Sequence, residues 1–434
     1  MILYLKMYLL SSILYVIYLI NYIVLRETEQ YLYLGRFFDY NLNIGNVVLV
    51  YFMSVPFIAL ILKNSLDKIF PMLLSTLIIL GVLPGVIIYS LSNDKSMLTF
   101  FIFYIYIIFI FSLFSRKEII LNLNEEENYI STTKVINLKV LQIFGVIGFV
   151  FYIYLTIKYF NIINFRGINE VYIQRSLFAS IVSGWEVYLI TFSKYISAFS
   201  FLIIAINLRN IYYLYPTIFI YLIDYSLAAH KASILLLVFA IFYYTVLSKL
   251  NIKRYYFISL FIVISIFSLL LQLNIYFSTA WSVNLVGLYD RVFHVTSGLF
   301  ARFYEFANEN YFFYGGSGIL GKLFSGVNEA YTFVIGETYF SENVRANADI
   351  IADGYINFGI IGSFLQLFIL WLFFNKTDDS TFERNFNSLI PLILIYSMVL
   401  FSMGLQTSLL TGGMFFFILL VKFGFKTTLR NIGD

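Results

Sequence analysis

The chain has 434 residues, of which 61% are hydrophobic and only 12% are charged, and its formal net charge is +4. A soluble globular protein carries roughly 25% charged residues, and a water-soluble domain of this composition would expose large apolar patches and aggregate. These values exclude soluble enzymes, disordered proteins and nucleic-acid binders, and they predict a polytopic helical membrane protein. The absence of cysteine excludes disulfides, thiolate nucleophiles and Cys-based metal sites. Two histidines are too few for a His-rich metal centre.

Apolar runs long enough for a membrane helix recur along the whole chain. A helix needs about 20 mostly apolar residues to cross a bilayer, and the first run lacks the cleavage site of a signal peptide. We therefore predict an all-α fold with about twelve spans, forming one transmembrane domain over residues 1–434. The predicted spans are 5–25, 44–62, 70–91, 97–115, 139–160, 186–207, 211–228, 231–249, 255–276, 350–374, 388–406 and 408–423. The span count stays open near 226–232 and 404–410.

The distribution of Lys and Arg over the short loops predicts the orientation. These residues gather in alternate loops, which by the positive-inside rule places both termini in the cytoplasm. Two of the external connections are long, residues 161–185 and residues 277–348. Long loops are usually functional or disordered, and aromatic residues and helical spacing of apolar residues argue against disorder here. We therefore expect the functional site in these two loops.

Both external loops carry arginines. The shorter one has Arg166 and Arg175, with Phe165 and Tyr172 close to them in sequence. A guanidinium is a permanently charged, forked donor that suits phosphate oxygens. Arginines on the same external side therefore suggest a shared anionic ligand, although exposed arginines are also common where nothing binds.

Residues 290–309 in the large loop have the spacing of an amphipathic helix. Its polar stripe includes Arg291, His294 and Arg302. Arg291 and Arg302 lie eleven positions apart on one face, about 16 Å along the axis, so one pyrophosphate cannot reach both. Either they bind two different groups, or the helix lies at the interface with a solvated polar face.

The segment that leads from the large loop back into the membrane carries Arg345, Asn347, Asp349 and Asp353. The two aspartates are four residues apart and share a helix face. Because a charge at membrane depth costs roughly 2.5–3.5 kcal/mol, each carboxylate should face an aqueous cavity or a partner. A carboxylate here can act as a general base or sugar ligand, or it can cap the helix N-terminus. We favour the cap for Asp349, and both interpretations stay open for Asp353.

Two further patterns have mainly structural interpretations. Lys194, Asp224 and Lys231 fall in the outer halves of neighbouring spans, and Asp224 is expected to pair with Lys231, with His230 at the interface. The stretch Gly316–Gly321 matches G-x-G-x-x-G by letters. A dinucleotide site needs a preceding strand and a βαβ unit, so we predict no nucleotide binding.

The twelve spans, the two Arg-bearing loops and the segment Arg345–Gly362 together resemble the Wzy-type O-antigen polymerases of bacterial inner membranes. The stretch Val171–Arg175 looks like the family's first-loop Tyr/Arg pattern. The stretch Ala229–Ser233 is similar to the small-Lys-small run that the family often has there. The related O-antigen ligases usually have His-Asn before the tenth span, whereas this chain has Ala346-Asn347, which favours the polymerase.

The resemblance implies an all-α glycosyltransferase of the C-type class whose active site faces the periplasm. Its substrates would be undecaprenyl-pyrophosphate-linked oligosaccharides, with a growing chain transferred to the non-reducing end of a lipid-linked repeat unit. A chain-length regulator would be a partner, and no cofactor or metal would be needed. Expected substrate-binding residues are Arg166, Tyr172, Arg175, Lys231, Arg291, Arg302, Arg345 and Asn347. Asp353 and His294 are the candidate bases. An O-antigen ligase and a flippase or other transporter of lipid-linked sugars are the alternatives.

Overall fold

The computed structural model describes residues 2–27, 43–64, 69–92, 95–114, 131–165, 171–246, 255–275, 289–309, 331–339, 346–347, 349–378, 386–410 and 412–430. Nearly all of these residues are helical, as the composition predicts. Contacts between backbone positions divide the chain into two units. The first is Met1–Glu125, Lys253–Asp378 and Ser397–Gln406, and the second is Glu126–Ile252, Asp379–Tyr396 and Thr407–Asp434.

The described part of the first unit is helical throughout. Its elements are α1 (Ile2–Glu27), α3 (Ile44–Asn64), α4 (Ile69–Leu77), the π-helix η1 (Ile78–Val82), α5 (Leu83–Ser90), α6 (Lys95–Phe114), α14 (Tyr255–Ile275), the π-helix η8 (Arg291–Val295), α16 (Thr296–Glu309), α18 (Tyr331–Tyr339) and α19 (Ile350–Asp378).

The second unit combines helices with one pair of strands. Its elements are β1 (Ser131–Ile136), α8 (Leu138–Lys158), the 3-10 helix η3 (Phe160–Ile162), α9 (Val171–Ile181), α10 (Gly184–Phe192), the π-helix η5 (Ser193–Ser197), α11 (Ala198–Leu208), the 3-10 helix η6 (Ile211–Tyr213), α12 (Leu214–Ala228), α13 (Lys231–Thr245), α22 (Met414–Phe423) and β2 (Phe425–Arg430). Two helices, α20 (Phe386–Ser402) and α21 (Leu405–Leu410), contain residues of both units.

Each of the twelve predicted spans contains a helix. Within the described residues, seven helical segments are long and apolar enough to cross a membrane. They are Ile2–Leu25, Ile44–Lys63, Ile69–Ser90, Ser96–Phe114, Leu138–Lys158, Gly184–Leu208 and Ile350–Phe374. Four shorter apolar helices are Leu236–Thr245, Phe261–Leu273, Leu392–Ser402 and Met414–Phe423. These helices are consistent with a polytopic membrane protein.

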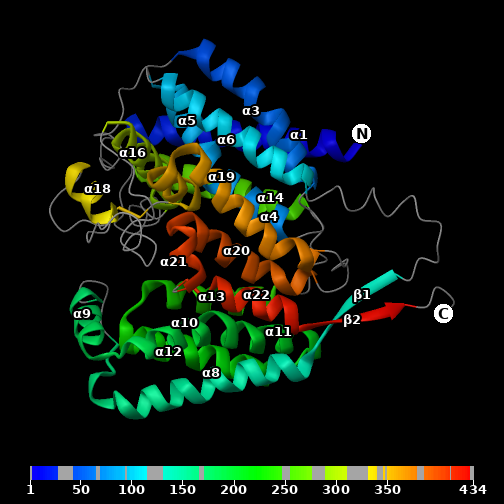
Figure 1. The fold of residues 1–434 in the computed structure, drawn as a ribbon, viewed down its shortest axis with the longest axis vertical. Coiled ribbons are helices and arrows are strands. Elements are labelled where there is room, and N and C mark those ends of the chain that lie inside the picture. Colours follow the sequence, from blue (N-terminus) through cyan, green and yellow to red (C-terminus); the bar gives the residue numbers. More distant parts are fainter. Residues whose placement is uncertain are drawn as a thin grey trace. The chain divides into compact units, whose positions relative to one another are not determined.

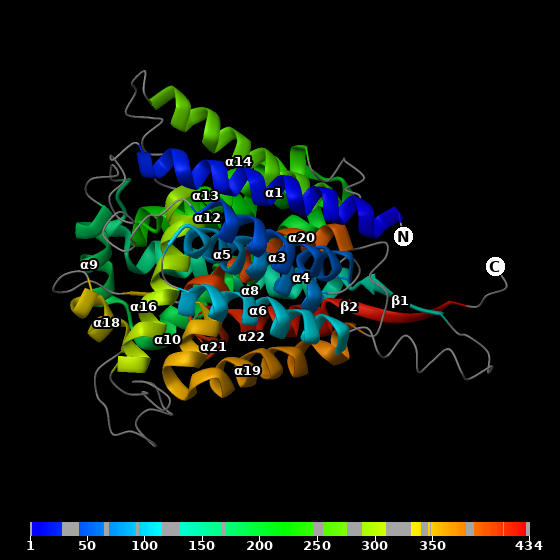
Figure 2. The same ribbon diagram turned by 90° about the horizontal axis from the view of Figure 1, so that it is seen from above.

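The core of the first unit is the segment α4–η1–α5, in which every residue is buried. Glycines let neighbouring rings approach this segment, since a Cβ at Gly81 or at Gly85 would collide with the ring of Phe401 or of Phe101, respectively. The Ser297 hydroxyl donates to the Gly81 carbonyl at 2.7 Å. Figure 2 shows α1 and α14 side by side.

The second unit packs α8 against the continuous helix α10–η5–α11 and against α12. Gly148 makes this approach possible, because a Cβ there would collide with Ser197. The Ser197 hydroxyl donates to the Phe144 carbonyl at 2.6 Å. Strands β1 and β2 form an antiparallel pair that joins the start of α8 to the end of α22 (Figure 1), in register from Ser131 with Arg430 to Ile136 with Phe425.

Helix α19 is broken at Phe358 and Gly359, where Gly359 has φ 63° and ψ −150°. The two arms fold back on each other. A Cβ at Gly354 would lie 2.6 Å from the Ser363 backbone, and the Ser363 hydroxyl donates to the Ile351 carbonyl at 2.8 Å. In a straight helix, residues twelve positions apart are about 18 Å apart. The first arm, residues 350–357, is therefore a short helix in a hairpin and not the first half of a straight span.

Candidate functional site

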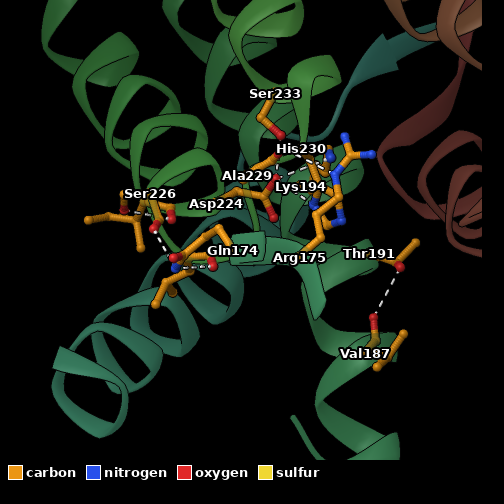
Figure 3. Close-up of polar contacts among 12 residues, drawn as sticks. Gln174, Arg175, Val187, Thr191, Lys194, Asp224, Ser226, Ala229, His230 and Ser233 are labelled. Carbon is orange, nitrogen blue, oxygen red and sulfur yellow. Dashed lines mark hydrogen bonds and ion pairs between the residues drawn. The ribbon is translucent and has the colours of Figure 1, made fainter. Parts of the chain in front are cut away.

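The polar cluster in Figure 3 lies where α12 ends and α13 begins. Helix α12 stops at Ala229, whose φ of 48° reverses the chain, and His230 is the N-cap of α13. Asp224, in the last two turns of α12, is buried. Its carboxylate accepts from the Tyr152 hydroxyl at 2.8 Å and also from the Ser233 hydroxyl.

Two basic side chains lie against the same carboxylate. The Lys194 ammonium is 3.2 Å from Asp224 Oδ2, and His230 Nδ1 is also 3.2 Å from it. Lys194 is buried and lies in the π-helix η5, whereas 41% of the His230 side chain is exposed. Asp224 thus pairs with Lys194 and His230, which the sequence did not predict, and the expected pairing with Lys231 stays a prediction. Lys231 lies one residue beyond the turn, and its side chain is outside the described part of the structure.

Helix α9 of the shorter loop brings Arg175 to this turn. Arg175 Nε donates to the Ala229 carbonyl at 3.2 Å, and the Arg175 side chain is half-buried. The neighbouring Gln174 amide donates to the carbonyls of Ile162 and Leu227 at 2.7 and 3.0 Å, which fastens α9 to the end of α12. Val171–Arg175 and Ala229–Ser233, far apart in sequence, thus meet at one place (Figure 3).

The first unit holds a second group of polar residues around the α19 hairpin. Asp353, on the first arm, is buried and accepts from the Tyr331 hydroxyl of α18 and from the Gln366 amide of the second arm, the latter at 2.6 Å. A Cβ at Gly404 would collide with the Asp353 carboxylate, so a side chain there would require Asp353 to shift. Asp353 has hydrogen-bonding partners, as expected of a carboxylate at membrane depth.

Asp349 caps the N-terminus of α19, as we favoured from the sequence. Its carboxylate accepts from the Ala352 N–H at 2.7 Å, three residues further along the chain. Burial raises the pKa of this carboxyl from 3.8 to about 7, although the backbone N–H groups of Ala352 and Ile351 lower it. At neutral pH, Asp349 is therefore a titrating group and not a fixed negative charge.

His294 has a partner that our reading of the sequence missed. Its Nδ1 lies 3.0 Å from Asp290 Oδ1, and both side chains are buried. The rings of Tyr22 and Tyr289 stand edge-on to the imidazole at 5.4 and 5.6 Å. The spacing of four residues between Asp290 and His294 was the signal that could have identified the pair.

The helix predicted over residues 290–309 is present, but its polar stripe is not continuous. The π-helix η8 (Arg291–Val295) interrupts the α-helical spacing on which the shared face of Arg291 and Arg302 was predicted. His294 of that stripe is buried instead of solvated. Arg302 forms an ion pair with Glu305 and lies 5.1 Å from the Tyr339 ring centroid.

Several predicted residues cannot be placed at either site. Asn347 is exposed. Arg166, Arg345 and the side chains of Tyr172, Lys231 and Arg291 lie outside the described residues. Sequence spacing does not reveal three further residues of these sites. They are Lys194, which contacts Asp224, and Tyr331 and Gln366, which contact Asp353. Among the described residues, no group of three His, Cys, Asp or Glu side chains could hold a metal ion.

Comparison of the chain with protein-family models, with curated proteins and with solved structures gives no match.

Proposed function

We propose that this chain is a membrane glycosyltransferase of the Wzy type, which polymerises oligosaccharide repeat units carried on undecaprenyl pyrophosphate. One observation supports this proposal above the others. Arg175 is fixed at the turn between α12 and α13, where Lys194 and His230 also lie. The turn thus gathers Arg175, Lys194 and His230 beside the Asp224 carboxylate, and such basic groups suit a ligand with several negative charges.

In the proposed reaction, a hydroxyl of the lipid-linked repeat unit attacks the anomeric carbon of the growing chain. The new glycosidic bond forms as the bond from that carbon to the pyrophosphate oxygen breaks, and undecaprenyl pyrophosphate leaves with the bonding electrons. Donors aimed at the departing charge lower the barrier, and Arg175 is the first candidate for this role. The hydroxyl proton passes to a base, for which Asp353 and His294 remain the candidates.

The direct test is polymerisation in vitro by the purified chain in liposomes, with lipid-linked repeat units as the only substrate. The wild-type chain should produce a ladder of products. The Arg175→Ala variant should lose about 10²–10³-fold in rate, the usual effect of removing one donor to a developing oxyanion. Arg209→Ala is the matched control, because Arg209 is an exposed residue at the end of α11. Equal ladders from both variants would contradict the proposal.

A transporter of lipid-linked oligosaccharide is the second candidate, and the break in α19 favours it. Transporters often build their binding sites from interrupted helices. In this hairpin, Asp353 of the first arm lies between Tyr331 of α18 and Gln366 of the second arm. The cell phenotype distinguishes the two functions. Loss of a polymerase leaves single repeat units on the surface, whereas loss of a transporter leaves none. A ligase would instead transfer finished polysaccharide and would make no ladder from repeat units alone.

The remaining expectations follow from the polymerase proposal. The chain would act in the bacterial inner membrane with its site facing the periplasm, and would work with a chain-length regulator. Apolar grooves between helices would hold the polyprenyl chain. Asp353→Asn should slow turnover more than it weakens substrate binding, and unchanged turnover would remove Asp353 as the base.

A further inference from the structure

Helix α9 presents three different faces. One face packs against its own unit: Gln174 is buried and bonded to carbonyls, and Phe178 is buried with its ring 5.8 Å from the Tyr159 ring. The Tyr159 hydroxyl also donates to the Ile181 carbonyl at 3.4 Å. These contacts fix the rotation of α9 about its own axis.

The second face is apolar and exposed. Ile173, Leu177 and Ile181 recur every four residues and therefore form one stripe, and they are 57%, 39% and 43% exposed. The third face carries Ser176 and Ala179, both exposed, and Ser180 is exposed at the border between this face and the stripe. A helix with an apolar stripe beside a polar one, both outside the protein core, has the pattern of a segment that lies in a membrane surface.

The surroundings of α9 point to lipid as the occupant of the apolar stripe. Helices α8 and α10, which precede and follow α9, belong to the candidate spans Leu138–Lys158 and Gly184–Leu208. The ends of these spans next to α9 expose Ile157 and Trp185, 74% and 55% respectively. These apolar side chains lie at the ends of candidate spans, where a bilayer would cover them, and α9 connects the two ends. Exposed tryptophan is also typical of the membrane–water boundary.

The length of α9 excludes a crossing. Its 11 residues span about 16 Å, roughly half the hydrocarbon thickness of a bilayer. We propose that α9 lies flat in the membrane–water interface, with Ile173, Leu177 and Ile181 in the lipid. In this position, the helix holds Arg175 on the flank away from the stripe, at the level of the lipid phosphates. The binding of a substrate pyrophosphate by Arg175 at this level rests on the proposed function. The position of α9 in the membrane interface does not rest on it.

The absence of cysteine makes a direct experiment possible. Single cysteines replace Ile173, Leu177 or Ile181 in the stripe, and Ser176 or Ala179 on the third face as matched controls. Each carries a bimane label in phosphatidylcholine–phosphatidylglycerol liposomes. The quenchers are nitroxides on the lipid acyl chains and iodide in the water. Because interfacial helices lie about 5–10 Å into the headgroup and acyl boundary, the stripe labels should be quenched by nitroxide and protected from iodide, with the reverse at Ser176 and Ala179.

Two outcomes would overturn the proposal. Equal iodide quenching at all five positions would place the helix in water. Protection of the stripe from both quenchers would show that protein covers it, whether another segment of this chain or a second copy. Each labelled variant is first checked for a monodisperse elution profile, and three stripe positions remain informative if one variant fails to fold. Because this experiment does not measure polymerisation, it tests the position of α9 even if the proposed function is wrong.

Discussion

The carboxylate of Asp224 shows how the fold keeps a buried charge inside a helical membrane protein. Its described partners come from three helices and the turn after α12, namely Tyr152, Lys194, His230 and Ser233. Replacing Lys194 by Met should leave Asp224 without its main counter-charge. Breaking a buried pair in this way typically costs about 3–5 kcal/mol. SDS-titrated unfolding of the purified protein measures the loss.

A double variant gives the control for this prediction. In Lys194→Met/Asp224→Asn no uncompensated charge remains, so part of the lost stability should return even though the ion pair is absent. If the double variant is as unstable as the sum of the single variants, the two side chains act independently. The ion pair would then not be what stabilises the turn.

Asp349 predicts a pH dependence of stability. Its pKa is about 7 in the folded protein and 3.8 without the fold, so the folded state binds more protons between these pH values. The contribution of Asp349 to stability is therefore present in acid and is lost as pH rises from about 4 to about 7, on the order of a few kcal/mol in total.

The Asp349→Asn variant tests this dependence. Asparagine keeps an oxygen that can accept from the Ala352 N–H but does not titrate. The wild-type melting temperature in detergent should fall between pH 5 and pH 8 relative to that of the variant. Parallel melting curves across this range would mean that Asp349 does not take up a proton on folding.

At the residue scale, the sequence indicated which residues have a structural role better than it indicated which residues they contact. The cap at Asp349 was predictable, because a helix N-terminus requires an acceptor within the next few residues. The pairing of Asp224 with Lys194 was not, since it depends on how α12 packs against η5 and on the reversal at Ala229. Asp290 is close to His294 in sequence, but only burial makes their contact important.

At the scale of elements, the hairpin in α19 depends on glycines. Gly359 has a backbone conformation that is essentially restricted to glycine, and a side chain there should cost about 1–3 kcal/mol. Gly354 lies against the Ser363 backbone, which cannot move aside. Gly354→Ala and Gly359→Ala should therefore both lower the unfolding midpoint in an SDS titration. Both should also reduce activity if Asp353 takes part in it.

Gly184→Ala is the matched control, because nothing lies within 4 Å of a Cβ at that position and the backbone is helical there. It should be neutral or stabilising by less than about 1 kcal/mol. A loss as large at Gly184 as at Gly354 would mean that the destabilisation is unrelated to the hairpin.

The helices themselves were predictable, because the backbone N–H and C=O groups of a long apolar run in lipid must form hydrogen bonds with one another. The departures from regular α-helical geometry within these helices were not predictable. Within the described residues, π-helices at 78–82, 193–197 and 291–295 change the face that the following residues present. The last of these interrupts the α-helical spacing on which the shared face of Arg291 and Arg302 was predicted. The break at Gly359 was also missed, because glycines at 354, 359 and 362 are compatible with close packing of a straight helix as well as with a hairpin.

At the scale of the whole molecule, the pairing of β1 with β2 constrains the membrane topology. Backbone hydrogen bonds between residues 131–136 and 425–430 require both strands to lie on the same side of the membrane. The chain between them must then cross an even number of times. The predicted spans from 139–160 to 408–423 number eight and satisfy this condition. If the number of spans near 226–232 or 404–410 were wrong by one, the total would be odd and would not satisfy the condition. The pairing of the strands therefore limits the span counts that the sequence left open.

This constraint leads to a labelling prediction. Lys134 and Thr427 face each other in the strand register, and neither replacement removes a buried side chain from a helix. In spheroplasts, a membrane-impermeant maleimide should leave both Lys134→Cys and Thr427→Cys unmodified until the membrane is permeabilised, as the positive-inside rule places these residues in the cytoplasm. Ser176→Cys, one predicted crossing away from Lys134, is the control and should react in intact spheroplasts. Opposite reactivity of Lys134→Cys and Thr427→Cys would separate the two strands across the membrane and contradict both their pairing and the even number of spans.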